Sequence, residues 1–147
     1  MIAAAVLGFD AVKPDEASAT IVRDPTATCA ERPASAAAPT AVQGGHPERS
    51  LYGVDAAPPE RDLAHVLGDG YVVVRYRRNV TRDQERALEE WSGGQVGLIV
   101  APASARAAPV VEARSAKLRF TCDGINVDGL AAFQERWLRE RRADATR

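Results

Sequence analysis

Cysteine, lysine and histidine are all scarce in this chain. Its two cysteines, Cys29 and Cys122, lie too far apart to form the closely spaced motif of a zinc or iron–sulfur site. Only Lys13 and Lys117 are lysines, and the net charge of -1 gives no electrostatic argument for binding nucleic acid or an anionic membrane. The other cationic residues are arginines and alanine is abundant, which is typical of a high-GC bacterial genome of the actinobacterial type.

A long apolar run is also missing from the sequence. The N-terminal "MIAAAVLGF" is much shorter than the ~20 residues that a membrane-spanning helix needs. It also lacks the basic residues that open a secretory signal peptide. As written, the chain is therefore predicted to have no membrane span and to be cytoplasmic, with export as the alternative if the start site is mis-assigned. The two cysteines would stay reduced in a cytoplasm and could pair in an oxidising compartment.

The composition changes near residue 50. Residues 12–47 are rich in Ala, Pro, Thr, Ser and Asp and show no sustained apolar period, so they can bury little surface to offset the entropy of ordering. We predict an extended or partly disordered segment over 1–50, with one strand near 19–23. A single α+β domain is predicted over 51–142, followed by a frayed tail over 143–147.

Helical and strand patterns alternate within the predicted domain. Prolines followed by apolar residues at helical spacing predict a short helix over 58–67, which Gly68 and Gly70 end. The apolar runs over 71–77 and 96–101 predict two buried strands.

Between these strands, Thr81 and Gln84 form a capping box and predict a helix that runs to Trp91. The sequence over 110–122 predicts a hairpin, and Asn126 or Asp128 is expected to cap a final amphipathic helix.

The order of these elements predicts a small mixed sheet of the α+β class. Two strands that flank a helix should be parallel with a right-handed crossover, and the hairpin should add antiparallel strands. We expect the two amphipathic helices on one face of the sheet and the N-terminal segment wrapped around it.

Several segments together resemble the bacterial domain of unknown function 3105. The similarity covers roughly residues 44–142 and is most specific in "HVLGDGYVVVRYR", with "GGHPERSLYGV" before it and "VGLIVAPA" and "LRFTCDG" after it. Members of that family carry His-Asn-Leu-Glu-His-Gly before a valine-rich strand. His65, Leu67 and Gly70 match this hexapeptide, and His46 stands at the histidine of the family's first element.

The chain departs from the family's hexapeptide at the other three positions. Val66 replaces the asparagine, Gly68 the glutamate and Asp69 the second histidine. The resemblance therefore implies the α+β fold together with a degenerate form of the family's histidine cluster.

His46, His65 and Asp69 are the candidate metal ligands. Two imidazoles and one carboxylate form a set that zinc, iron or copper can use with coordination positions left open. His65 and Asp69 share a helix face only if the helix continues through Gly68. In the simpler interpretation, which we favour, His65 hydrogen-bonds within the junction and Asp69 caps a turn. A third interpretation makes His65 or Asp69 an acid or base without metal.

Cys122 is the remaining catalytic candidate, because it lies just before the predicted last helix, where a thiol pKa can be lowered. Its alternation with Leu118 and Phe120 instead points it inward, and we favour a buried structural cysteine.

A cluster of arginines in "RYRRNVTRDQER" could suggest an anion site. Acidic residues alternate with them at Asp83, Glu85, Glu89 and Glu90, so a solvated, charge-balanced surface is the better prediction. The arginines are Arg75, Arg77, Arg78, Arg82 and Arg86.

The leading hypothesis is a non-catalytic or weakly catalytic accessory or binding protein of a bacterial pathway. It would recognise a small molecule or a protein partner near the His65 junction, and it could form a homodimer. The alternative is a small metal-dependent enzyme that uses His46, His65 and Asp69. No organic cofactor and no nucleic-acid partner are predicted, and a divalent Zn, Fe or Cu ion is the one cofactor that these residues suit.

Overall fold

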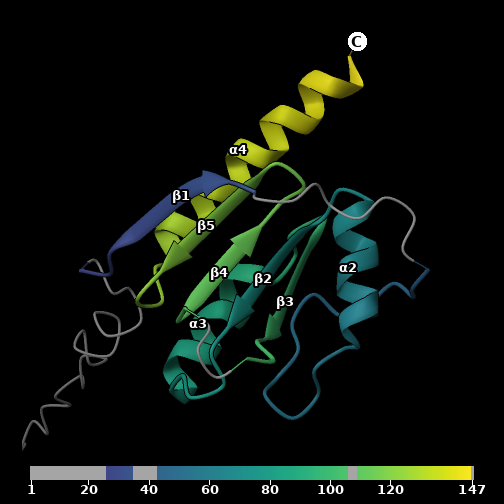
Figure 1. The fold of residues 1–147 in the computed structure, drawn as a ribbon. Coiled ribbons are helices and arrows are strands. Elements are labelled where there is room, and N and C mark those ends of the chain that lie inside the picture. Colours follow the sequence, from purple (N-terminus) through teal and green to yellow (C-terminus); the bar gives the residue numbers. More distant parts are fainter. Residues whose placement is uncertain (1–25, 35–42, 106–108, 147) are drawn as a thin grey trace, which may run out of the picture.

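A five-stranded mixed sheet organises the computed structural model, which describes residues 26–34, 43–105 and 109–146 (Figure 1). The strand order across the sheet is β1-β5-β4-β2-β3. The strands are β1 (Cys29–Pro33), β2 (Val72–Tyr76), β3 (Leu98–Pro102), β4 (Val111–Arg114) and β5 (Leu118–Cys122). The helices are α2 (Glu60–Gly68), α3 (Arg82–Ser92) and α4 (Val127–Ala145).

The strand pairing confirms the predicted topology. β2 and β3 are parallel and are joined through α3, while β4 and β5 form the antiparallel hairpin. The capping box of α3 is present, because the backbone N–H of Gln84 donates to Thr81 Oγ1 and that of Thr81 donates to Gln84 Oε1. The side chain of Asn126 caps α4 by accepting from the backbone N–H of Gly129.

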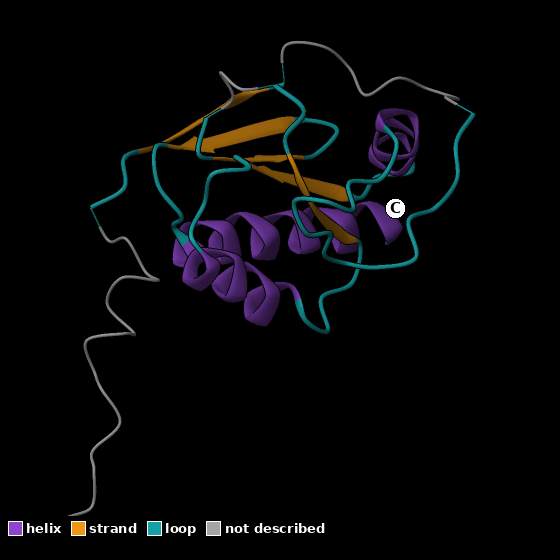
Figure 2. Cartoon of the chain, turned by 90° about the horizontal axis from the view of Figure 1, so that it is seen from below, coloured by secondary structure: helices purple, strands orange, loops and turns teal. Residues whose placement is uncertain are grey.

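Helices cover both faces of the β2–β3 half of the sheet (Figure 2). α3 and α4 lie on one face, as predicted for the two amphipathic helices, and α2 adds a partial third layer on the other. β2 and β3 are apolar on both faces, which is why neither face can be left in water. Around α2, the buried apolar residues are Leu63, Val66, Leu67, Val73, Ile99 and Ala101.

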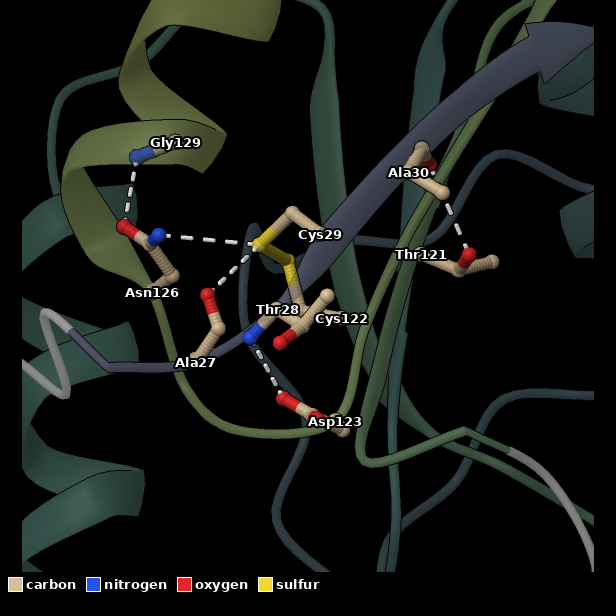
Figure 3. Close-up of a disulfide and its surroundings, with 9 residues drawn as sticks. All are labelled: Ala27, Thr28, Cys29, Ala30, Thr121, Cys122, Asp123, Asn126 and Gly129. Carbon is tan, nitrogen blue, oxygen red and sulfur yellow. Dashed lines mark hydrogen bonds between the residues drawn. A yellow bond between two sulfur atoms is a disulfide. The ribbon is translucent and has the colours of Figure 1, made fainter.

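An edge strand that the sequence did not predict lies within the segment 1–50. β1 pairs antiparallel with β5, and Cys29 stands directly opposite Cys122. Their sulfur atoms form a disulfide with an S–S distance of 2.05 Å, to which Asn126 donates a hydrogen bond (Figure 3). The strand predicted near 19–23 lies outside the described residues. At the other end of the chain, α4 continues to Ala145, beyond the expected boundary at 142.

The described helices contain no candidate membrane span. None of them combines the length with the apolar character that crossing a bilayer requires.

Candidate metal centre

The turn that joins α2 to β2 fixes the position of Asp69. Gly68 stays helical, and Asp69 caps the helix with its N–H donating to the carbonyl of His65 at 3.0 Å. Gly70 then reverses the chain with a φ of +85°, a conformation that side-chain-bearing residues rarely adopt. Its carbonyl accepts from Trp137 Nε1 at 3.1 Å and from Arg141 Nη1 at 2.9 Å. α4 therefore holds the turn in place, and His65 and Asp69 lie on one helix face.

The segment that contains His46 is docked on α2 through two glycines. The backbone N–H of Gly45 donates to Asp62 Oδ1 at 2.9 Å. Gly44 lies so close to α2 that an added Cβ would meet the carbonyl oxygen of Arg61 and the Cβ of His65, each at 2.8 Å. Only glycine fits there without displacing the backbone, and this close approach brings His46 to the end of α2.

The side chains of His46, His65 and Asp69 converge on one point. Asp69 Oδ2 lies 3.0 Å from His46 Nε2 and 3.4 Å from His65 Nε2. One ligand atom from each residue lies within 4.8 Å of the other two. The imidazole rings of His46 and His65 meet edge to face, with centroids 5.0 Å apart. About half of the His46 side chain is exposed and a quarter of the His65 side chain, so the cluster opens to solvent on one side.

This geometry suits a first-row metal ion. Ligand atoms that are each about 2.0–2.2 Å from one tetrahedral ion lie roughly 3.2–3.6 Å from one another. The two separations from Asp69 Oδ2 are close to that range, and the ligand atoms of the two histidines lie within 4.8 Å of each other, so a bound ion would draw the ligand atoms together. Three protein ligands leave at least one coordination position open toward solvent. The residues present therefore fit a divalent metal.

The favoured sequence interpretation agrees with the contacts of this junction, where Asp69 caps α2 and His65 Nε2 lies 3.4 Å from Asp69 Oδ2. Asp69 caps α2 through its backbone N–H. Its carboxylate lies against both imidazoles.

The structure corrects the prediction that Cys122 is a candidate catalytic nucleophile. Its sulfur is bonded to Cys29 and therefore provides no thiolate, whereas the expectation that Cys122 is buried is confirmed. Cys122 packs in the core that α3 and α4 cover, and His65 is on α2 on the opposite face of the sheet.

Four residues that position the cluster were not identified from the sequence. Gly44 and Asp62 dock the His46 segment, while Trp137 and Arg141 hold the turn at Gly70. The paired glycines directly before His46 were the available signal, because such glycines often mark a close approach of two backbones.

Comparison with known proteins identifies no relative. No protein-family model matches the chain, and neither a curated protein nor a solved structure matches it. The resemblance to the 3105 family therefore stays a prediction.

Proposed function

We propose that this protein is a metal-binding accessory protein in which His46, His65 and Asp69 hold a divalent zinc, iron or copper ion. A small molecule or a side chain of a protein partner would take the open coordination position. The observation that supports this proposal is the convergence of one ligand atom from each of the three residues to within 4.8 Å. Two separate segments supply these atoms, and the contacts of Gly44 and Gly45 with α2 position them.

The exposure of the cluster favours binding over catalysis. The side chains of His46 and Asp69 are each about half exposed, so the cluster is open to solvent. Enzymes that use a metal as a Lewis acid commonly enclose it in a shaped, dry cavity. A small metal-dependent enzyme is the second candidate, because a set of three protein ligands with an open position is also the arrangement of catalytic zinc sites.

The disulfide supports a compartment different from the one that the sequence predicted. Disulfides form and persist mainly in oxidising environments, and both cysteines of the chain are in this one. We therefore propose that the protein works outside the reducing cytoplasm. Protein alkylated at the moment of extraction from its host should show no free thiol until it is denatured and reduced. Two free thiols in the native extract would contradict this location.

The metal content of the purified protein tests the function. Protein made without a histidine tag should contain one equivalent of a divalent metal by elemental analysis, and His65→Ala should contain none. Asp69→Asn should also lose the metal. Asp83→Asn is the matched control, because Asp83 is a half-exposed carboxylate whose one ion pair among the described residues is with Arg86.

The same measurement separates metal binding from a purely structural role. If the three side chains only hydrogen-bond to one another, the wild-type protein will contain no stoichiometric metal, even after incubation with zinc and removal of the excess. Circular dichroism of each variant shows whether a loss of metal reflects a loss of fold.

A further inference from the structure

The carboxyl ends of β2 and β3 border a cavity of about 430 Å³. Because these two strands are parallel, both chains leave the sheet at the same edge. In open sheets with parallel strands, ligands bind in the crevice outside the carboxyl ends of the strands. The residues that line the cavity are Arg77, Arg78 and Asn79 after β2, and Ala103, Ser104 and Ala105 after β3.

The charge of this lining is positive. Its described residues include two arginines and no acidic residue, although the whole chain has a net charge of -1. In the sequence the charges of the arginine cluster appear balanced, but in the structure not every arginine of the cluster pairs with an acidic residue. Arg75 pairs with Glu60 and Arg86 pairs with Asp83, whereas Arg78 lines the cavity and donates to backbone carbonyls.

Arg78 is held in position without being neutralised. Its Nε donates to the carbonyl of Ala103 at 3.2 Å, and its Nη1 donates to the carbonyl of Val54. Among the described residues it forms no ion pair, and its Nη2 donates to none of them. A guanidinium that is anchored by backbone carbonyls keeps its full charge and loses little entropy when it binds an anion.

Glu60, an acidic residue beside Ser104, is already paired. The Glu60 carboxylate accepts from Arg75 Nη1 at 2.9 Å and from the hydroxyl of Ser104. Its charge is therefore compensated by Arg75.

We propose that this cavity binds a small organic anion through a phosphate or carboxylate group. Arg78 pairs with the anionic oxygens, and Asn79 provides a neutral hydrogen-bonding group. The volume is within the range of small-molecule sites. The cavity lies near the first residue of α2 and the metal centre near its last, about 13 Å apart along nine residues. The two sites are therefore independent, and the anion site stands whether or not the chain binds metal.

Nuclear magnetic resonance titration of the ¹⁵N-labelled full chain tests this site. Inorganic phosphate and citrate are added separately at constant ionic strength, with sodium chloride as the reference titration. We expect saturable shifts of the backbone amides of Asn79, Ser104 and Ala105 and of the Nε signal of Arg78. Saturation by phosphate alone identifies a phosphoryl ligand, and saturation by citrate alone identifies a carboxylate ligand.

Arg78→Ala should weaken the binding of the active probe by about tenfold or more, because a charge-assisted pair is lost. Arg86→Ala is the matched control and should bind as the wild type does, since Arg86 contacts Asp83 on the surface. If the loss of the Arg78 anchors unfolds that variant, Arg78→Gln, which can keep a hydrogen bond to a backbone carbonyl but carries no charge, tests the same pocket. Shifts with neither probe, or equal affinity in the folded variant and the control, would overturn the proposal.

Discussion

The two ends of the parallel pair β2–β3 offer different chemistry on one scaffold. At the amino end, Gly70 precedes β2 and the ligand atoms of His46, His65 and Asp69 converge. At the carboxyl end, Arg77 and Arg78 follow β2 directly and line a cavity whose described lining contains no acidic residue. The amino-end cluster depends on a segment docked from elsewhere in the chain, whereas much of the carboxyl-end site comes from the continuation of the strands. The first site is therefore the more sensitive to small changes in packing.

Removing the disulfide at the β1 edge of the sheet should have the largest effect. It tests whether the two sites at the ends of β2 and β3 are independent of that edge. Cys29→Ser with Cys122→Ser removes a link between residues 93 apart, so the free energy of unfolding should fall by about 2–5 kcal/mol. Zinc binding and anion binding should persist below the transition, because β2 and β3 do not contact β1 in the sheet order.

Urea unfolding measures this loss. Reduction of the wild type should lower its unfolding midpoint to that of the double variant, and the double variant itself should not respond to the reductant. A wild-type curve that is identical with and without reductant would contradict the stabilising role of the disulfide.

A methyl group added at Gly44 should weaken metal binding at the amino end of β2 without affecting the anion cavity at the carboxyl end. In Gly44→Ala the new Cβ would lie 2.8 Å from the carbonyl oxygen of Arg61, so the segment must move and take His46 with it. We expect zinc affinity to fall by about 10–100-fold, the range seen when groups that orient metal ligands are lost. Gly45→Ala is the control, since its Cβ would lie at an ordinary 3.6 Å from Asp62 Oδ2.

Calorimetric titration with zinc compares these two variants. Equal zinc affinity in Gly44→Ala and Gly45→Ala would show that the docking of the His46 segment does not position the ligand.

Tyr76, the last residue of β2, should make stability at the carboxyl end sensitive to alkali. Its hydroxyl donates to the carbonyl of Tyr52 at 2.7 Å, so Tyr76→Phe should lower the free energy of unfolding by about 1 kcal/mol. Burial, with a smaller contribution from the Glu85 carboxylate, raises the pKa of Tyr76 above its usual range. A raised pKa means that this stabilisation is complete below the ordinary tyrosine pKa of about 10 and is lost as the pH rises toward the folded-state value.

Unfolding between pH 7 and pH 11 tests this dependence. The wild type should lose stability above about pH 10 more steeply than Tyr76→Phe does. If the free energy of unfolding of the two proteins falls in parallel above pH 10, the alkaline loss of stability is due to groups other than Tyr76.

The smallest expected effect concerns the ion pair beside the anion cavity. The hydrogen bond from Arg75 holds the pKa of Glu60 below its ordinary value, against the opposing effect of burial. A lowered pKa means that the stabilisation is present above the ordinary glutamate pKa and is lost as the pH falls through the folded-state value. Glu60 is largely exposed, so the contribution should stay below about 1 kcal/mol.

Melting temperatures between pH 6 and pH 3 should therefore fall slightly more for the wild type than for Glu60→Gln. Identical pH dependence in the two proteins would show that the pair does not contribute to stability.

Local sequence signals predicted most of the secondary structure. Thr81 and Gln84 define the start of α3 because a capping box depends only on residues three positions apart. β1 was missed because an edge strand buries little, and four of the five residues in "CAERP" are exposed. Its place in the sheet depends on the pairing of Cys29 with Cys122, which the sequence left open.

The two sites were predictable to different extents. His46, His65 and Asp69 could be named as candidates by residue type, but their convergence depends on the close approach at Gly44, which is a tertiary contact. The arginines appeared balanced because a charge count along the chain does not show which acids are within reach. In the structure the acids pair with Arg75 and Arg86 and leave Arg78 to backbone carbonyls.

The most direct test of the metal centre is a zinc titration followed by the imidazole nitrogen signals of the ¹⁵N-labelled protein. The chain contains only two histidines, so both rings can be assigned with a single His46→Gln variant. Our account predicts that the Nε2 signals of His46 and His65 shift together and saturate at one equivalent of zinc, and that Asp69→Asn prevents saturation at that ratio. Rings that do not respond, or that respond independently of each other and of Asp69, would contradict it.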